Sequence, residues 1–134
     1  MISAWESLHF ATLELVRSTP IKQRLVTAYR RHLTAISADQ LPGEVRESFS
    51  QIMNSLSGVQ PLKGEDGVAA SVRKMSIQEA DDCAGLIVEV FGITCRLLLN
   101  AARASAEVVQ LHSAERDSDD TLEAEDIPAL IASH

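Results

Sequence analysis

The side chains that most often carry out chemistry in proteins are few in this sequence and lie far apart. They are the histidines His9, His32, His112 and His134 and the cysteines Cys83 and Cys95. No set of them has the spacing of a zinc site, and the sequence contains no H-E-x-x-H, no G-x-S-x-G and no glycine-rich phosphate loop. We therefore expect no catalytic residue, no metal site and no cofactor, and we predict that the protein is not an enzyme.

The stretch TPIKQRLVTAYRRHL, residues 19–33, is basic, since it carries Lys22, Arg24, Arg30 and Arg31 and no acidic residue. Three interpretations are open: a solvated helix face, a nucleic-acid surface, or a surface for an acidic protein segment. Nucleic acid is disfavoured because Tyr29, the aromatic residue of the stretch, falls on the core side and because the chain has a formal net charge of −7. We predict that Arg24, Arg30 and Arg31 bind a protein partner.

The acidity of the chain belongs to its C-terminal end. Residues 1–112 hold eleven Lys and Arg against twelve Asp and Glu, a net charge of −1. Residues 113–134 hold one Arg against seven acidic residues, a net charge of −6. We expect this acidic tail to be flexible, and either to fold back on the basic stretch or to reach a partner subunit.

The acidic run is followed by DIPALIASH, in which Ile127, Leu130 and Ile131 are apolar. Acid followed by a few apolar side chains is typical of a segment that orders on binding, and a disordered terminus has the same composition. We predict that these three residues contact a protein partner.

Capping signals and apolar spacing predict a series of helices. Ser3 with Glu6, and Ser76 with Glu79, have the S-x-x-E spacing of a capping box. Helices are expected over residues 4–17, over 20–36 with Thr19 as the N-cap, from 42 to about 57, over 68–74, and from 76 to about 112.

The first helix should bury one side and leave Phe10 outside. Its apolar side is formed by Trp5, Leu8, Thr12, Leu15 and Val16. At about 100° per residue, Phe10 points among charged residues instead. We expect Phe10 to be accessible and to belong to the partner-binding surface.

The last helix is the longest, at about 36 residues or roughly 54 Å. Apolar and small residues recur along it in steps of three and four, which is a heptad pattern. Three short helices cannot cover this length, so we predict a homodimer whose seam contains Leu97, Ala101, Ala104, Val108 and Leu111.

Residues 83–102 also have transmembrane length, but Glu89 and Arg96 would cost about 2.5–3.5 kcal/mol each inside a bilayer. We therefore expect no membrane span.

These features predict an all-α fold: a bundle of three short amphipathic helices packed on one long central helix, with an acidic C-terminal tail. The bundle domain should comprise residues 1–112 and the tail residues 113–134.

On one helix, Cys83 and Cys95 would lie about 18 Å apart, too far for a disulfide. Two such thiols, with no leader sequence, favour a reducing cytoplasm.

Three stretches, IKQRLVTAYRRHL, DQLPGEVRESF and VRKMSIQEA, carry a resemblance. Over about residues 20–91 the chain resembles a group of small bacterial proteins of uncharacterised function. The resemblance implies a bacterial source and a soluble helical fold, and it supplies no catalytic residues.

Three hypotheses of function follow. The first is a non-catalytic, homo-oligomeric adaptor, or a regulatory or inhibitory subunit of a bacterial complex such as an antitoxin or a defence-system component. The second is a DNA-binding regulator that uses the basic helix 20–36. The third is a sensor that binds a small ligand or metal within the bundle.

Overall fold

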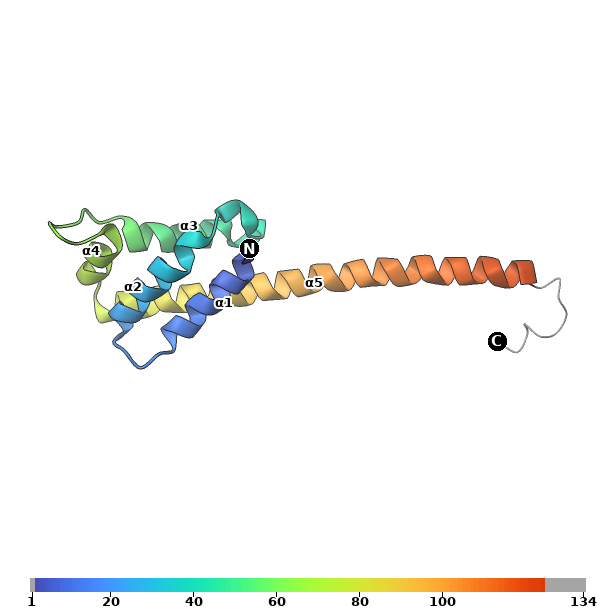
Figure 1. The fold of residues 1–134 in the computed structure, drawn as a ribbon, viewed down its shortest axis with the longest axis horizontal. Helices are drawn as coiled ribbons and strands as arrows, with labels where there is room; N and C mark the ends of the chain where they lie inside the picture. Colours follow the sequence, from blue (N-terminus) through green and yellow to red (C-terminus); the bar gives the residue numbers. More distant parts are fainter. Residues whose placement is uncertain (1, 125–134) are drawn as a thin grey trace. The chain divides into compact units, whose positions relative to one another are not determined.

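The computed structural model describes the backbone of residues 2–124 and the side chains of residues 2–110, and within this range the chain is all-α, with no strand (Figure 1). The helices are α1 Ala4–Leu15, α2 Ile21–Arg31, α3 Gly43–Ser57, α4 Gly67–Lys74 and α5 Ile77–Ala124, with short 3₁₀ helices at Leu33–Ala35 and Ala38–Gln40. The contacts divide the chain into two units, Met1–Leu97 and Leu98–His134.

Local signals placed most helix starts correctly. At α1 the Ser3 Oγ accepts a hydrogen bond from the backbone N–H of Glu6, and the Glu6 carboxylate accepts one from the backbone N–H of Ser3. The same reciprocal pair joins Ser76 and Glu79 at the start of α5, with both bonds at 3.0 Å. Both predicted capping boxes are confirmed. Their partners lie three residues apart, so the sequence alone specifies them.

The bounds of α2 were predicted less well. The N-cap is Pro20 and not Thr19, and no side chain caps the helix there. The α-helix ends at Arg31 instead of about residue 36, and a 3₁₀ turn at Leu33–Ala35 follows. The tighter turn redirects the chain while it still buries both Leu33 and Ile36, so tertiary packing overrides the longer helical pattern.

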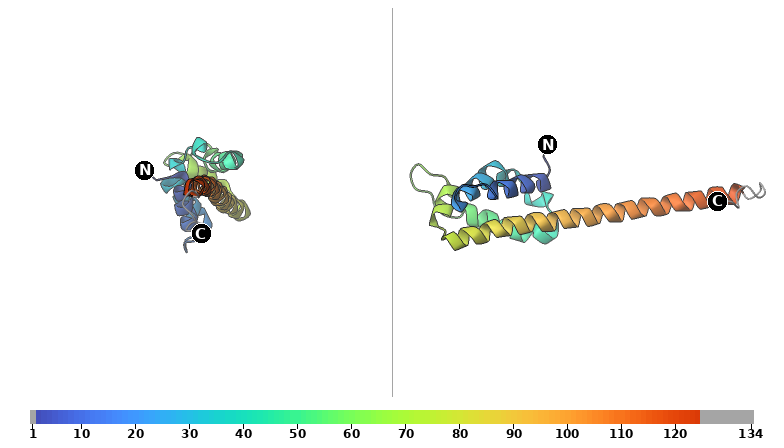
Figure 2. Two further views of the ribbon diagram at one scale, coloured as in Figure 1. Left: turned by 90° about the vertical axis from the view of Figure 1, so that its right-hand side faces the viewer. Right: turned by 90° about the horizontal axis from the view of Figure 1, so that it is seen from below.

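The core of the Met1–Leu97 unit lies between α1–α4 and the first part of α5, which run close together in the views of Figure 2. Leu8, Leu25 and Leu56 are completely buried in it. The contribution of α5 follows the predicted heptad pattern. Its buried residues, here called the core seam, are Ala80, Cys83, Ile87, Val90 and Thr94.

The predicted faces of α1 were partly right. Phe10 is 39% exposed, as expected. Trp5 and Val16 were expected on the buried side and are 42% and 72% exposed. The buried residues are Ala4, Ser7, Leu8, Ala11 and Leu15, of which Leu8 and Leu15 were expected. Two alanines let α1 approach its neighbours closely, so the buried face is narrower than the apolar pattern and is rotated from it.

Helix α5 extends further than expected, because it ends at Ala124 and not near His112. The expected division between residues 112 and 113, with a separable tail, stays a prediction. Every residue from Leu98 to Gln110 is exposed. Among the described residues, no helix has both the length and the apolar content that a bilayer crossing requires.

Candidate functional site

The basic residues of α2 contact acidic and carbonyl groups of the chain itself. Arg30 makes a two-pronged contact with Asp66, with its Nη2 2.8 Å from one carboxylate oxygen and its Nε 3.0 Å from the other. Asp66 also caps α4, since its side chain accepts a hydrogen bond from the backbone N–H of Ala69 at 3.0 Å. The hydrogen bond from Arg30 lowers the pKa of Asp66, and the contact raises the pKa of Arg30. Arg30 therefore ties α2 to the start of α4.

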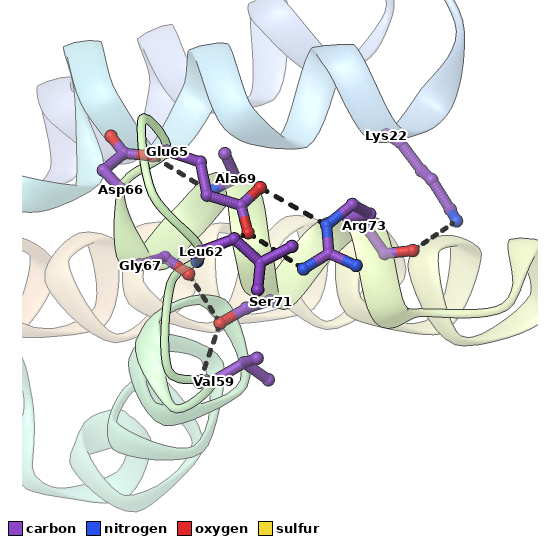
Figure 3. A network of polar contacts seen from close by, with 9 residues as sticks. All are labelled: Lys22, Val59, Leu62, Glu65, Asp66, Gly67, Ala69, Ser71 and Arg73. Atoms are coloured by element: carbon purple, nitrogen blue, oxygen red, sulfur yellow. Dashed lines mark hydrogen bonds and ion pairs between the residues drawn. The ribbon is translucent and has the colours of Figure 1, made fainter.

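Lys22 belongs to a second link between the same helices (Figure 3). Its ammonium donates to the backbone carbonyl of Arg73, at the end of α4, at 3.3 Å. Arg73 in turn donates to Glu65 at 2.9 Å, and the Glu65 carboxylate accepts the backbone N–H of Leu62 at 3.0 Å. The hydrogen bond from Arg73 lowers the pKa of Glu65. Lys22 thus ties α2 to the end of α4, and Arg73 holds the loop before α4 through Glu65.

Glu14 of α1 is the acidic centre of a third group. Its carboxylate lies 3.8 Å from Arg31 Nη1, 3.5 Å from His32 Nε2 and 3.9 Å from Arg17 Nε. Glu14 itself is only 13% exposed, whereas the Arg31 side chain is 70% exposed. Arg24 donates through Nη1 to the backbone carbonyl of Leu15, at the end of α1, and its buried Nε has no hydrogen-bond partner among the described residues. A carboxylate and a backbone carbonyl of α1 therefore contact the basic side chains of α2.

Phe10 lies in a row of rings from α1, from α5 and from His32, the residue that follows α2. The ring centroids of Phe10 and His9 are 5.8 Å apart and stacked, and those of His9 and Phe91 are 5.5 Å apart and stacked. On the other side, the Phe10 ring is tilted against His32 at 5.8 Å. Phe10 lies against His32, and His32 and Arg31 both lie near Glu14, so two residues of the predicted partner surface are linked through this group. Arg24 and Arg30 are engaged elsewhere.

The predicted dimer seam, Leu97, Ala101, Ala104, Val108 and Leu111, can be described for all but its last side chain. Leu97 is half-buried, while Ala101, Ala104 and Val108 are exposed. The Leu111 side chain, and Ile127, Leu130 and Ile131 of the C-terminal segment, lie outside the described residues. Within residues 98–110 the large apolar side chains Leu98, Leu99, Val108 and Val109 are between 43% and 64% exposed.

An open groove between α3, α4 and the start of α5 was not predicted from the sequence. Its volume is about 440 Å³. The residues that line it are Ile52, Ser55, Val59, Ser71, Lys74, Met75, Glu79, Asp82, Cys83 and Leu86. Cys83 is one of the buried residues that line it, and burial raises the pKa of the Cys83 thiol to about 11. A thiol with this pKa stays protonated near neutral pH, which is the state of an inert core cysteine.

Within the described part of the chain, no group of three or more His, Cys, Asp and Glu side chains could hold a metal ion. Comparison of the chain with protein-family models, curated proteins and solved structures gives no match.

Proposed function

We propose that the protein is a non-catalytic interaction module that self-associates through α5 and acts as an adaptor or a regulatory subunit of a bacterial cytoplasmic complex. The observation that supports self-association is the exposure of α5 beyond Leu97. Leu98, Leu99, Val108 and Val109 leave apolar area in water within one short stretch of a single helix, where every residue from Leu98 to Gln110 is exposed. Exposed apolar surface of this kind is typical of contact surfaces between proteins.

The contacts of α2 give less support to the alternative of a DNA-binding regulator. A phosphate-binding helix needs cations that are available to the backbone of the nucleic acid. Here Arg30 is engaged by Asp66, Lys22 and Arg24 donate to backbone carbonyls, and Arg31 lies near Glu14. Binding of DNA would have to replace contacts that hold α1, α2 and α4 together.

Sedimentation equilibrium of the full chain tests self-association. We expect the wild type to be a dimer at tens of micromolar. The double variant Val108→Glu with Val109→Glu places charges on two faces of α5 and should be monomeric with unchanged helix content. Val16→Glu is the matched control, because Val16 is 72% exposed on α1. A monomeric wild type, or a double variant that associates as the wild type does, contradicts the proposal.

The groove favours a second candidate function, which is binding of a small ligand. Its lining combines apolar side chains such as Met75 and Leu86 with the charged groups of Lys74 and Asp82. This mixture suits a molecule that has an apolar body and a polar end. Native mass spectrometry of the chain purified from its source tests it. An added mass on the wild-type chain that is absent from a Leu86→Arg variant supports a bound ligand. If the wild type and the variant both show only the mass of the chain itself, ligand binding is contradicted.

A further inference from the structure

Four charged side chains follow one another along α5 at intervals of seven residues, in the order acid, acid, base, base. They are Asp82, Glu89, Arg96 and Arg103, here called the charge row, and all four are exposed. Residues seven apart lie on the same side of a helix. Within residues 2–110, Glu89, Arg96 and Arg103 form no ion pair, and Asp82 accepts only a hydrogen bond from Gln78 at 2.8 Å. The charges of this row are therefore available to a partner.

An apolar face runs beside the charge row. Its residues recur in steps of three and four, and we call it the glycine face: Gly85, Val88, Gly92, Cys95, Leu99 and Ala102. Val88 is 44% exposed and Leu99 is 50% exposed. The core seam, by contrast, is covered by the chain's own helices. A second helix can therefore pack along the glycine face even in the part of α5 whose core seam is already buried.

The two glycines have no role that the single chain explains. A Cβ added at Gly85 or at Gly92 would have no atom within 4 Å, and neither residue has a positive φ. Glycine in the middle of a helix lowers helix stability relative to alanine. Positions without a side chain do, however, let the backbone of a second helix approach closely.

We propose that two copies of the chain pair through their glycine faces in antiparallel orientation, with the twofold axis midway between Gly92 and Cys95. The pairing rests on the proposed self-association and assigns its face and direction. In this register Gly92 faces the partner's Cys95, and Val88 faces the partner's Leu99. Gly85 faces the partner's Ala102. Along the pair, layers of two small residues alternate with a layer of two larger ones, which suits closely packed helices.

The charge row fixes the direction. In the antiparallel register Glu89 lies opposite the partner's Arg96, and Asp82 lies opposite the partner's Arg103. The twofold axis repeats both pairs, so every charge of the row meets its opposite. In a parallel pair the row would face the partner's Ala84, Phe91 and Leu98, and no ion pair would form. Flanking charges of this kind set the partner and orientation of paired helices.

Charge reversal in the full chain tests the pairing. One variant carries Asp82→Arg and Glu89→Arg, so that its row is entirely basic. The other carries Arg96→Glu and Arg103→Glu, so that its row is entirely acidic. Each variant alone should dimerise at least about tenfold more weakly than the wild type, because like charges then face each other. An equimolar mixture should form a heterodimer, and the quadruple variant should recover the wild-type dimer. Glu44→Arg with Glu47→Arg, exposed on α3, is the matched control.

The outcomes separate the two proposals. A monomeric wild type contradicts self-association itself. If both charge variants dimerise as the wild type does, the glycine-face pairing is wrong and self-association still stands. The same conclusion follows if the equimolar mixture forms no heterodimer.

A distance measurement that depends on no charge reversal gives a second test. A spin label at Gln110→Cys, in a chain with Cys95→Ala, reports the direction of the helices, since Cys83 is buried. With a rise of 1.5 Å per residue, the antiparallel register places the two labels about 50 Å apart, whereas a parallel pair would place them roughly 10 Å apart. A short distance between the labels overturns the antiparallel pairing.

Discussion

Replacing Gly85 and Gly92 by alanine should stabilise the Met1–Leu97 unit. Both glycines lie in the interior of α5, where glycine is less favourable than alanine by about 0.8–1.0 kcal/mol. An added Cβ at either position has no atom within 4 Å. Each substitution should therefore yield nearly its full helix-propensity gain, without a packing penalty.

The two gains should add. Seven residues of helix separate the positions by about 10 Å, and they share no side-chain partner, which is the condition for additivity. The double variant should gain about 1.5–2 kcal/mol in the free energy of unfolding. For a unit of this size, about 4–8 °C of melting temperature corresponds to each kcal/mol.

The measurement is urea unfolding followed by far-UV circular dichroism, at protein concentrations low enough for the wild type to be monomeric. Gly58→Ala is the matched control. An added Cβ there would lie 2.7 Å from the backbone oxygen of Asn54, so this variant should lose stability. If the Gly85 and Gly92 variants lose stability as well, the space around α5 is not open and the reasoning is wrong.

Three further predictions concern other parts of the chain. Phe10→Ala should change the free energy of unfolding by much less than the roughly 3–5 kcal/mol of a core phenylalanine truncation, because Phe10 is 39% exposed; a loss of that size in thermal unfolding would place Phe10 in the core. Burial raises the pKa of the Cys83 thiol from 9.0 to about 11. Unfolding therefore releases a proton as the pH rises through this interval, and stability measured from pH 8 to 11 should fall; Cys83→Ala should flatten the decline, and an unchanged slope would refute the assignment. Deletion of residues 113–134 should leave helix content per remaining residue unchanged or higher in circular dichroism. If the acidic run docks on Arg31, its NMR resonances should shift between low and high salt, since charges are screened beyond about 10 Å at 0.1 M; unshifted resonances would exclude docking.

The features that could be predicted from the sequence are those fixed by nearby residues. The capping boxes of Ser3 with Glu6 and of Ser76 with Glu79 join residues three positions apart. The core seam has the predicted heptad spacing, and its residues from Ala80 to Thr94 are buried. The all-α fold follows from these local patterns and was predicted correctly.

The features that could not be predicted join residues distant in the sequence. Arg30 and Asp66 are 36 positions apart, and no local pattern pairs them. The pattern of α2 continued to residue 36, but the burial of Leu33 and Ile36 needed a change of direction that only the packed neighbours impose. The groove has the same origin, since α3, α4 and α5 each supply part of its wall.

The contrast between α2 and α5 bears on where a partner binds. The basic residues of α2 suggested a binding site because no acid stands near them in the sequence, yet Glu14 and Asp66 approach them in the fold. Each of these exposed pairs is weak, but together they make the cations less available to an outside carboxylate.

Along α5 the opposite holds, since Glu89, Arg96 and Arg103 form no ion pair within residues 2–110 and stand beside exposed apolar side chains. A partner that contacts α5 gains apolar burial and ion pairs without breaking internal contacts, whereas a partner that contacts α2 must compete with the chain's own acids. The charges of α5 are therefore the better candidates for recognition, although the basic stretch of α2 is the more conspicuous in the sequence.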